Sequence, residues 1–152
     1  QSAVKKSEFS DISSKYFGYL ALRYDEHTEV HELSNYVIIE KGEKLPVSKT
    51  KKFYTAYDGQ EAFALSVTEA NSFETDPNFV NVKWKGELEL PSGRDKGQKI
   101  EVTFSYDENQ VIKCSFLDVA SNKNTEIDID FGKPGVSDVE GEEVDIDQFI
   151  IE

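Results

Sequence analysis

The middle of the chain, between residues 100 and 118, consists of two segments in which apolar and polar residues alternate. In the first segment Ile100, Val102, Phe104 and Tyr106 alternate with Glu101, Thr103, Ser105 and Asp107. Successive side chains of a strand point to opposite faces, so this pattern predicts one buried face and one solvated face. Residues 107–110 are polar turn formers, and the return segment places Ile112, Cys114 and Phe116 inward. We therefore expect a β-hairpin at the centre of the fold.

Similar short segments recur along the rest of the chain and are separated by turn signals. The strand-like segments are residues 19–24, 36–39, 52–56, 62–69, 82–90 and 127–131. Pro46 interrupts regular structure, and the Asp58-Gly59 pair favours a tight turn because both residues tolerate a positive φ. No segment before Gly132 carries a sustained apolar stripe of helical period. The pattern predicts an all-β fold, namely an antiparallel β-sandwich of seven to eight strands.

The same pattern divides the chain into three regions. Residues 1–10 are polar and are expected to form a linker or a disordered N-terminus. Residues 11–131 contain all the strand-like segments and are expected to form the sandwich. Residues 132–152 are expected to be an acidic tail, because such a charge run is usually a solvated segment.

The charge balance restricts the classes of partner. The formal net charge is −13, and Lys133 is the only basic residue from Glu126 to the end of the chain. Nucleic acids and anionic membranes are bound by clustered lysine and arginine residues. We therefore expect neither nucleic acid nor a membrane as a partner.

Cys114 is the only cysteine, so no internal disulfide is possible. Its place on the inward face of its strand predicts a buried structural thiol rather than a nucleophile. A reducing compartment is compatible with this cysteine content, and we expect a cytoplasmic location. No apolar run has the length of a membrane span, and no leader-like segment is visible.

Little in the sequence points to catalysis. His27, Glu29 and His31 alternate and would share one face of a strand, which is a possible ligand set for a divalent metal, although this spacing also arises by chance. The many carboxylates have no marked base beside them, and no glycine-rich phosphate loop occurs. We expect no enzymatic activity, no metal and no cofactor in this domain.

Several motifs together resemble a known family. They are the first five residues of the hairpin at 100–104, the acidic turn after Tyr106, the polar loop at 120–123, residues 11–18, the Leu45-Pro46 pair and the segment Phe53-Tyr54-Thr55-Ala56-Tyr57-Asp58-Gly59-Gln60. Their order and spacing resemble the β-sandwich substrate-binding domain of the heat-shock protein 70 (DnaK-type) chaperone family. The resemblance covers about residues 11–131.

This resemblance implies a non-enzymatic module that binds an extended apolar segment of an unfolded protein. Backbone hydrogen bonds would hold any sequence, and one central pocket would select a Leu-like or Ile-like side chain. The implied groove-lining residues are Tyr19, Ala21, Phe53, Tyr54, Phe63, Leu65 and Ile100, and Leu22 and Ala56 are the implied pair that arches over the peptide. For Phe53, Leu65 and Ile100, an ordinary place in the hydrophobic core fits these residue types equally well.

The sequence also departs from the family pattern. Phe63 stands where a smaller β-branched residue is usual, so its ring should partly fill the pocket and alter peptide preference. The segment between Gly18 and Leu45 is longer than usual. Residues 6–10 lack the aliphatic interdomain linker, which weakens the expectation of ATP-driven coupling to an upstream nucleotide-binding domain and its cochaperones. Residues 135–140 resemble only the start of a helical lid, so 132–152 is either an acidic tail or a truncated lid segment.

Two other interpretations remain open. The chain is alternatively a structural or scaffolding β-sandwich that kept the fold and lost client binding, with Phe63 plugging the pocket. In a third interpretation residues 146–151 of the tail occupy the groove of their own or a neighbouring chain, and deleting them should raise peptide affinity.

Overall fold

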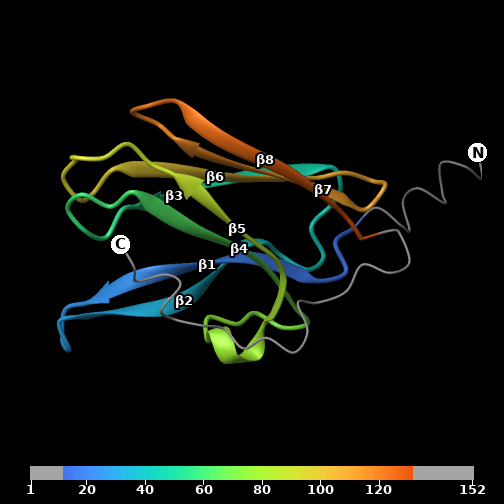
Figure 1. The fold of residues 1–152 in the computed structure, drawn as a ribbon. Helices are drawn as coiled ribbons and strands as arrows, with labels where there is room; N and C mark the ends of the chain where they lie inside the picture. Colours follow the sequence, from blue (N-terminus) through green and yellow to red (C-terminus); the bar gives the residue numbers. More distant parts are fainter. Residues whose placement is uncertain (1–11, 132–152) are drawn as a thin grey trace, which may run out of the picture.

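A computed structural model of the chain describes residues 12–131, which fold into two layers of β-strands (Figure 1). The strands are β1 (Tyr16–Asp25), β2 (Val30–Ile39), β3 (Val47–Tyr54), β4 (Ala62–Ala70), β5 (Asn81–Glu89), β6 (Lys99–Tyr106), β7 (Val111–Asp118) and β8 (Lys123–Asp130). One 3₁₀ turn, η1 (Pro77–Phe79), precedes β5. Among these residues no helix is long and apolar enough to span a membrane. The predicted all-β sandwich is confirmed.

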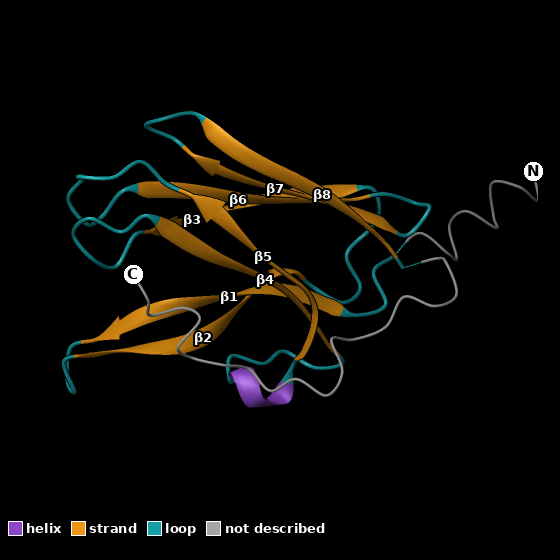
Figure 2. Ribbon diagram, viewed as in Figure 1, coloured by secondary structure: helices purple, strands orange, loops and turns teal. Residues whose placement is uncertain are grey.

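Each layer is a four-stranded antiparallel sheet (Figure 2). One sheet has the order β2-β1-β4-β5 and the other has the order β3-β6-β7-β8. The predicted central hairpin is β6–β7, in which Val102 lies opposite Phe116 and Phe104 lies opposite Cys114. All four of these side chains are fully buried, so the alternation in the sequence identified the inner face correctly.

Strands β2, β3 and β8 begin earlier than the apolar pattern predicts. β3 starts at Val47 rather than at residue 52, and four of its first six residues are exposed. Its backbone nonetheless pairs with β6 along its whole length, from Val47 opposite Tyr106 to Tyr54 opposite Lys99. Backbone pairing therefore extends these strands through polar residues that bury little surface. β3 also ends at Tyr54, so the predicted strand residues Thr55 and Ala56 lie in the β3–β4 loop.

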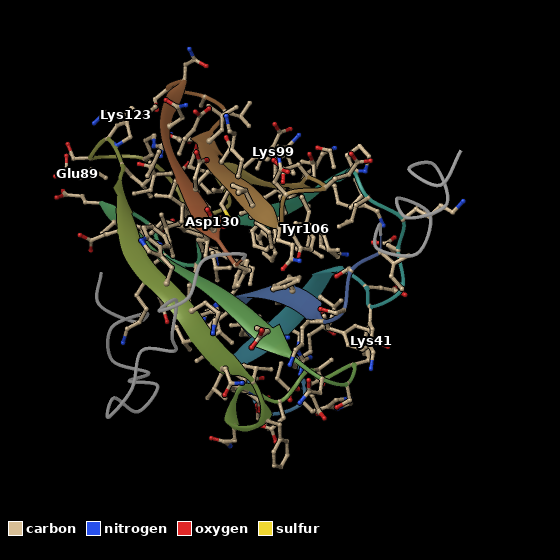
Figure 3. The ribbon with its side chains drawn as sticks, turned by 90° about the vertical axis from the view of Figure 1, so that its right-hand side faces the viewer. Lys41, Glu89, Lys99, Tyr106, Lys123 and Asp130 are labelled. Atoms are coloured by element: carbon tan, nitrogen blue, oxygen red, sulfur yellow. The ribbon has the colours of Figure 1, made fainter. Side chains whose placement is uncertain are left out.

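Aromatic side chains join the two sheets. The fully buried Tyr19 ring of β1 lies 4.9 Å from the Phe53 ring of β3 and 5.9 Å from the Phe116 ring of β7. The Trp84 ring of β5 stacks on the Phe116 ring of the other sheet, with the ring centroids 5.9 Å apart. Figure 3 shows side chains filling the space between the layers, with Lys99 and Tyr106 marking the ends of β6. These aromatic contacts join the sheets within a core that also contains many aliphatic side chains.

The outer edge of β2 is covered by the loop before η1. The amide of Asn35 donates to the carbonyl of Thr75 at 2.8 Å, and its side chain donates to the carbonyl of Glu74 at 2.9 Å. Thr68 of β4 donates its hydroxyl to Asn35 Oδ1 at 2.6 Å. The loop therefore supplies partners to an edge strand whose backbone would otherwise be open.

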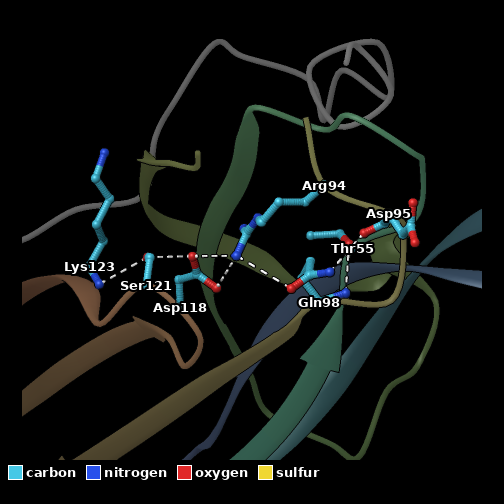
Figure 4. A network of polar contacts seen from close by, with 7 residues as sticks. All are labelled: Thr55, Arg94, Asp95, Gln98, Asp118, Ser121 and Lys123. Atoms are coloured by element: carbon cyan, nitrogen blue, oxygen red, sulfur yellow. Dashed lines mark hydrogen bonds and ion pairs between the residues drawn. The ribbon is translucent and has the colours of Figure 1, made fainter. Parts of the chain in front are cut away.

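A polar network holds the β5–β6 loop against the β3–β4 loop (Figure 4). Arg94 forms an ion pair with the fully buried Asp118 at 3.0 Å, and the Ser121 hydroxyl donates to the same carboxylate at 2.6 Å. The amide of Gln98 donates to Thr55 Oγ1 at 2.9 Å. Charged hydrogen bonds of this kind are stronger than neutral ones. The network thereby fixes the start of the β3–β4 loop relative to the body of the sandwich.

The Cys114 thiol is expected to be inert in the folded protein. It is fully buried, and burial raises the pKa of the thiol above its ordinary value, so the reactive thiolate is not formed near neutral pH. A thiol reagent such as Ellman's reagent should label the chain only after unfolding in guanidinium. As a control, a Cys114→Ser/Lys113→Cys variant has its thiol at an exposed position and should react at once. Rapid stoichiometric labelling of the folded wild type would contradict the buried placement.

Replacement of Asp118 by Asn should destabilise the fold. The substitution keeps the shape of the side chain but leaves Arg94, whose side chain is only 18% exposed, without its counter-charge. Breaking one partner of a buried pair costs on the order of 3 kcal/mol of unfolding free energy, measurable by urea denaturation. Glu32→Gln is the matched control because its pair with Arg23 is about half exposed, and it should cost less than about 1 kcal/mol. Equal effects of the two substitutions would contradict this account.

Candidate functional site

Strands β1 and β4 separate partway along the sheet, and the separation creates the candidate site. The two strands pair only from Tyr16 to Tyr19, opposite Ala70 to Val67. Beyond Tyr19, β1 pairs with β2 alone, and the β1–β2 hairpin (blue) extends away from the other strands in Figure 1. Among the described residues, the edge of β1 that faces β4 therefore has no strand partner over residues 20–25. An open backbone edge of this kind can accept an additional strand.

A cleft of about 780 Å³ lies between this hairpin and the end of β3. It is lined by Leu22 and Tyr24 of β1, His31 and Tyr36 of β2, residues 51–54 of β3, Thr55 and Ala56 of the β3–β4 loop, and Lys96 and Gly97 of the β5–β6 loop. Its volume is that of a typical ligand site. Because the polar network fixes the β5–β6 loop, one wall of the cleft has a firm support.

A much smaller cavity of about 40 Å³ lies next to the cleft, where β1 leaves β4. Leu22, Phe53, Tyr54 and Ala56 line both spaces, whereas Phe63 lines only the small one. This volume suits one or two water molecules and is well below the roughly 150 Å³ that holds a benzene ring. The Phe63 side chain forms part of the cavity wall, and its ring is stacked on the Tyr19 ring with the two centroids 6.4 Å apart.

An aromatic bridge connects the two walls of the cleft. The His31 ring of β2 lies 5.3 Å from the Tyr24 ring of β1 and 5.0 Å from the Tyr57 ring of the β3–β4 loop. The Tyr57 hydroxyl is also 3.4 Å from His31 Nδ1, which is long for a hydrogen bond. The bridge therefore rests mainly on ring contacts, and it ties the hairpin to the loop opposite.

The side chains that line the cleft suit the binding of a ligand. It contains aromatic rings, aliphatic groups and three lysines, and it contains no carboxylate, cysteine or serine. Burial raises the pKa of the Tyr36 hydroxyl, and the Arg23 charge partly offsets the increase, so this group stays a neutral donor. Burial likewise raises the pKa of Tyr19, whose hydroxyl donates to the carbonyl of Ala64 at 2.8 Å. None of these groups is placed as a nucleophile beside a base.

The predicted site residues fall into three groups. Leu22, Phe53, Tyr54 and Ala56 line the cleft, and Ala21 and Phe63 join them around the small cavity. Tyr19, Leu65 and Ile100 are at most 1% exposed and lie in the core beneath. Contact of any of the nine with a peptide stays a prediction, as does the arch formed by Leu22 and Ala56.

Sequence reasoning missed Tyr24, Tyr36 and the three lysines of the cleft. The signal for Tyr24 was present, because it lies directly opposite His31 in the hairpin and only the register was unknown. Lys51 and Lys52 gave no signal, since charged residues on a polar segment usually mark nothing more than a solvated face.

The suggested metal-ligand set of His27, Glu29 and His31 does not share a strand. β2 begins at Val30, so His27 and Glu29 lie in the preceding turn, where the amide of His27 donates to Asp25 Oδ1 at 2.8 Å. Glu29 has a positive φ of 61°, which breaks the strand alternation. Within residues 12–131, no group of three histidine, cysteine or acidic residues is placed to hold a metal ion.

Comparison with known families gives a match over most of the chain. Residues 24–148 match the family model described as Hsp70 protein. The matched region includes β2 to β8 and every residue that lines the cleft except Leu22, and the all-β sandwich fits a fragment like the substrate-binding domain of that family. The chain therefore belongs to the Hsp70 family.

Proposed function

We propose that this domain binds extended apolar segments of other polypeptides in the cleft between the β1–β2 hairpin and β3. The observation that supports the proposal most directly is the separation of β1 from β4, which leaves an open backbone edge beside an aromatic cleft. A peptide backbone can pair with such an edge whatever its sequence, and the rings of Tyr36, Phe53 and Tyr54 offer apolar surface to its side chains.

The proposed activity requires no reaction and no cofactor in this domain. The peptide would be held by backbone pairing and by burial of apolar surface, and the aromatic bridge at His31 would limit its escape from the cleft. The proposal also includes an upstream nucleotide-binding domain and cochaperones as partners of this domain. We propose a cytoplasmic location for it as well. Nucleic acid and membranes are not among the proposed partners, since the net charge is −13.

A second candidate function is a scaffolding sandwich that no longer binds clients. The small size of the inner cavity favours it, because about 40 Å³ leaves no room for a leucine side chain beneath Phe63. The two functions differ in whether an apolar peptide binds saturably in the cleft. The open cleft above the cavity favours the first.

Fluorescence anisotropy with a labelled heptapeptide of leucine-rich sequence should show saturable binding. Tyr54 is 55% exposed and lines the cleft, so Tyr54→Ala should weaken binding about tenfold without affecting the fold. Phe79 is 67% exposed and lies in η1, away from the cleft, so Phe79→Ala is the matched control and should leave affinity unchanged. A lack of binding, together with capture of one stable partner, would support the scaffold instead.

Phe63→Val should strengthen binding of peptides centred on leucine. Removing most of the phenyl ring enlarges the cavity beside Ala21 and Ala56, so a client side chain could enter. We expect several-fold tighter binding of a leucine-centred heptapeptide relative to an alanine-centred one in the same titration. Phe104→Val truncates a fully buried ring that lines neither space and controls for general loosening of the core. An unchanged preference in Phe63→Val would show that the ring does not restrict the pocket.

A further inference from the structure

We propose that the segment bound in the cleft carries aspartate or glutamate residues next to its apolar residues. This inference rests on the proposed peptide binding and names the class of peptide. It follows from the charge of the lining, which contains Lys51, Lys52 and Lys96 and no carboxylate. The chain as a whole has 30 acidic and 17 basic residues, so a lining that contains three lysines and no acidic residue differs from the average composition of the chain.

The three ammonium groups are available to a ligand. All three lysines are exposed, and in residues 12–131 none of them forms an ion pair or a side-chain hydrogen bond. Other lysines of the sandwich are engaged, as Lys49 is by Glu43 and Lys83 is by Glu69. The lysines of the cleft therefore keep their capacity for a carboxylate from outside.

The lysines also flank the apolar part of the cleft from two elements. Lys51 and Lys52 precede Phe53 on β3, while Lys96 lies in the β5–β6 loop. That loop is held in place, since the amide of Gly97 donates to the carbonyl of Thr55 at 3.0 Å. A peptide that placed apolar side chains over Phe53 would thus have basic groups on either side of them.

Three carboxylates around the cleft do not belong to its lining. Asp58 accepts from the amide of Lys96 at 2.9 Å and lies outside the lining. Glu101 lies opposite Lys52 in the β3–β6 pair and also does not line the cleft. Glu32 at the hairpin pairs with Arg23 at 3.6 Å. The tyrosines Tyr24 and Tyr54, both about half exposed, add hydroxyl donors for the same carboxylates.

The preference should be short in range and sensitive to salt. The net charge of −13 repels an acidic peptide at a distance, so only direct contacts with the lysines can favour it. Exposed ion pairs are individually weak and are screened by salt. Three such contacts together are expected to change affinity about tenfold.

The test uses three labelled peptides with one leucine-rich centre, flanked on both sides by two aspartates, two glutamines or two lysines. In anisotropy titrations the aspartate-flanked peptide should bind about tenfold more tightly than the lysine-flanked one, and added sodium chloride should reduce the difference. If the glutamine-flanked peptide binds saturably but the aspartate-flanked peptide has no advantage over the lysine-flanked one, this inference is wrong and the proposed function stands. If none of the three binds, both are overturned.

Charge reversal locates the effect in the cleft. The triple variant Lys51→Glu/Lys52→Glu/Lys96→Glu should reverse the order of the aspartate-flanked and lysine-flanked peptides. The control variant Lys41→Glu/Lys44→Glu/Lys123→Glu makes the same change in net charge at exposed positions outside the cleft and should keep the wild-type order. Equal effects of the two variants would show that the preference comes from overall charge and would overturn the assignment to these three lysines.

Discussion

The packing of the Tyr19 ring between the two sheets is the interaction on which the rest of the structure depends. The ring contacts Phe53 of the opposite sheet and Phe63 of its own sheet, and its hydroxyl satisfies the carbonyl of Ala64. It lies at the last residue where β1 and β4 still pair. Tyr19 therefore closes the core at the point where the sheet divides, and the cleft begins directly beyond it.

This arrangement separates the parts of the sandwich that must be rigid from the part that is open. The body of the fold is held by the aromatic core and by the buried Arg94–Asp118 pair. The β1–β2 hairpin beyond Tyr19 is held by its own backbone ladder, by the aromatic contacts at Tyr36 and His31, and by the hydrogen bonds of Asn35 to the loop before η1 and to Thr68. The end of the hairpin, residues 23–30, is mostly exposed. Elements with few packed neighbours open most readily, so movement of this end would be the simplest way to admit the proposed peptide into the cleft.

Much of the fold could be predicted from the alternation of apolar and polar residues, because a strand that buries one face has apolar residues at every second position. The β6–β7 hairpin is the clearest case, since every inward position from Ile100 to Tyr106 is buried. The first half of β3 could not be found in this way, because its residues are exposed and the strand exists through its pairing with β6. Predicted residues such as Phe53 and Tyr54 line the cleft, whereas Tyr24, Tyr36 and the three lysines of its lining were not predicted. The division of β1 from β4 depends on register, which no local pattern encodes.

The position of β3 at the edge of its sheet has a consequence for the behaviour of the protein in concentrated solution. β3 pairs with β6 on one side only, and strand edges of this type can join edge to edge into larger assemblies. Lys51 and Lys52 place like charges on this edge, so two copies approaching through β3 would repel each other. These charges therefore oppose self-association of the domain through β3.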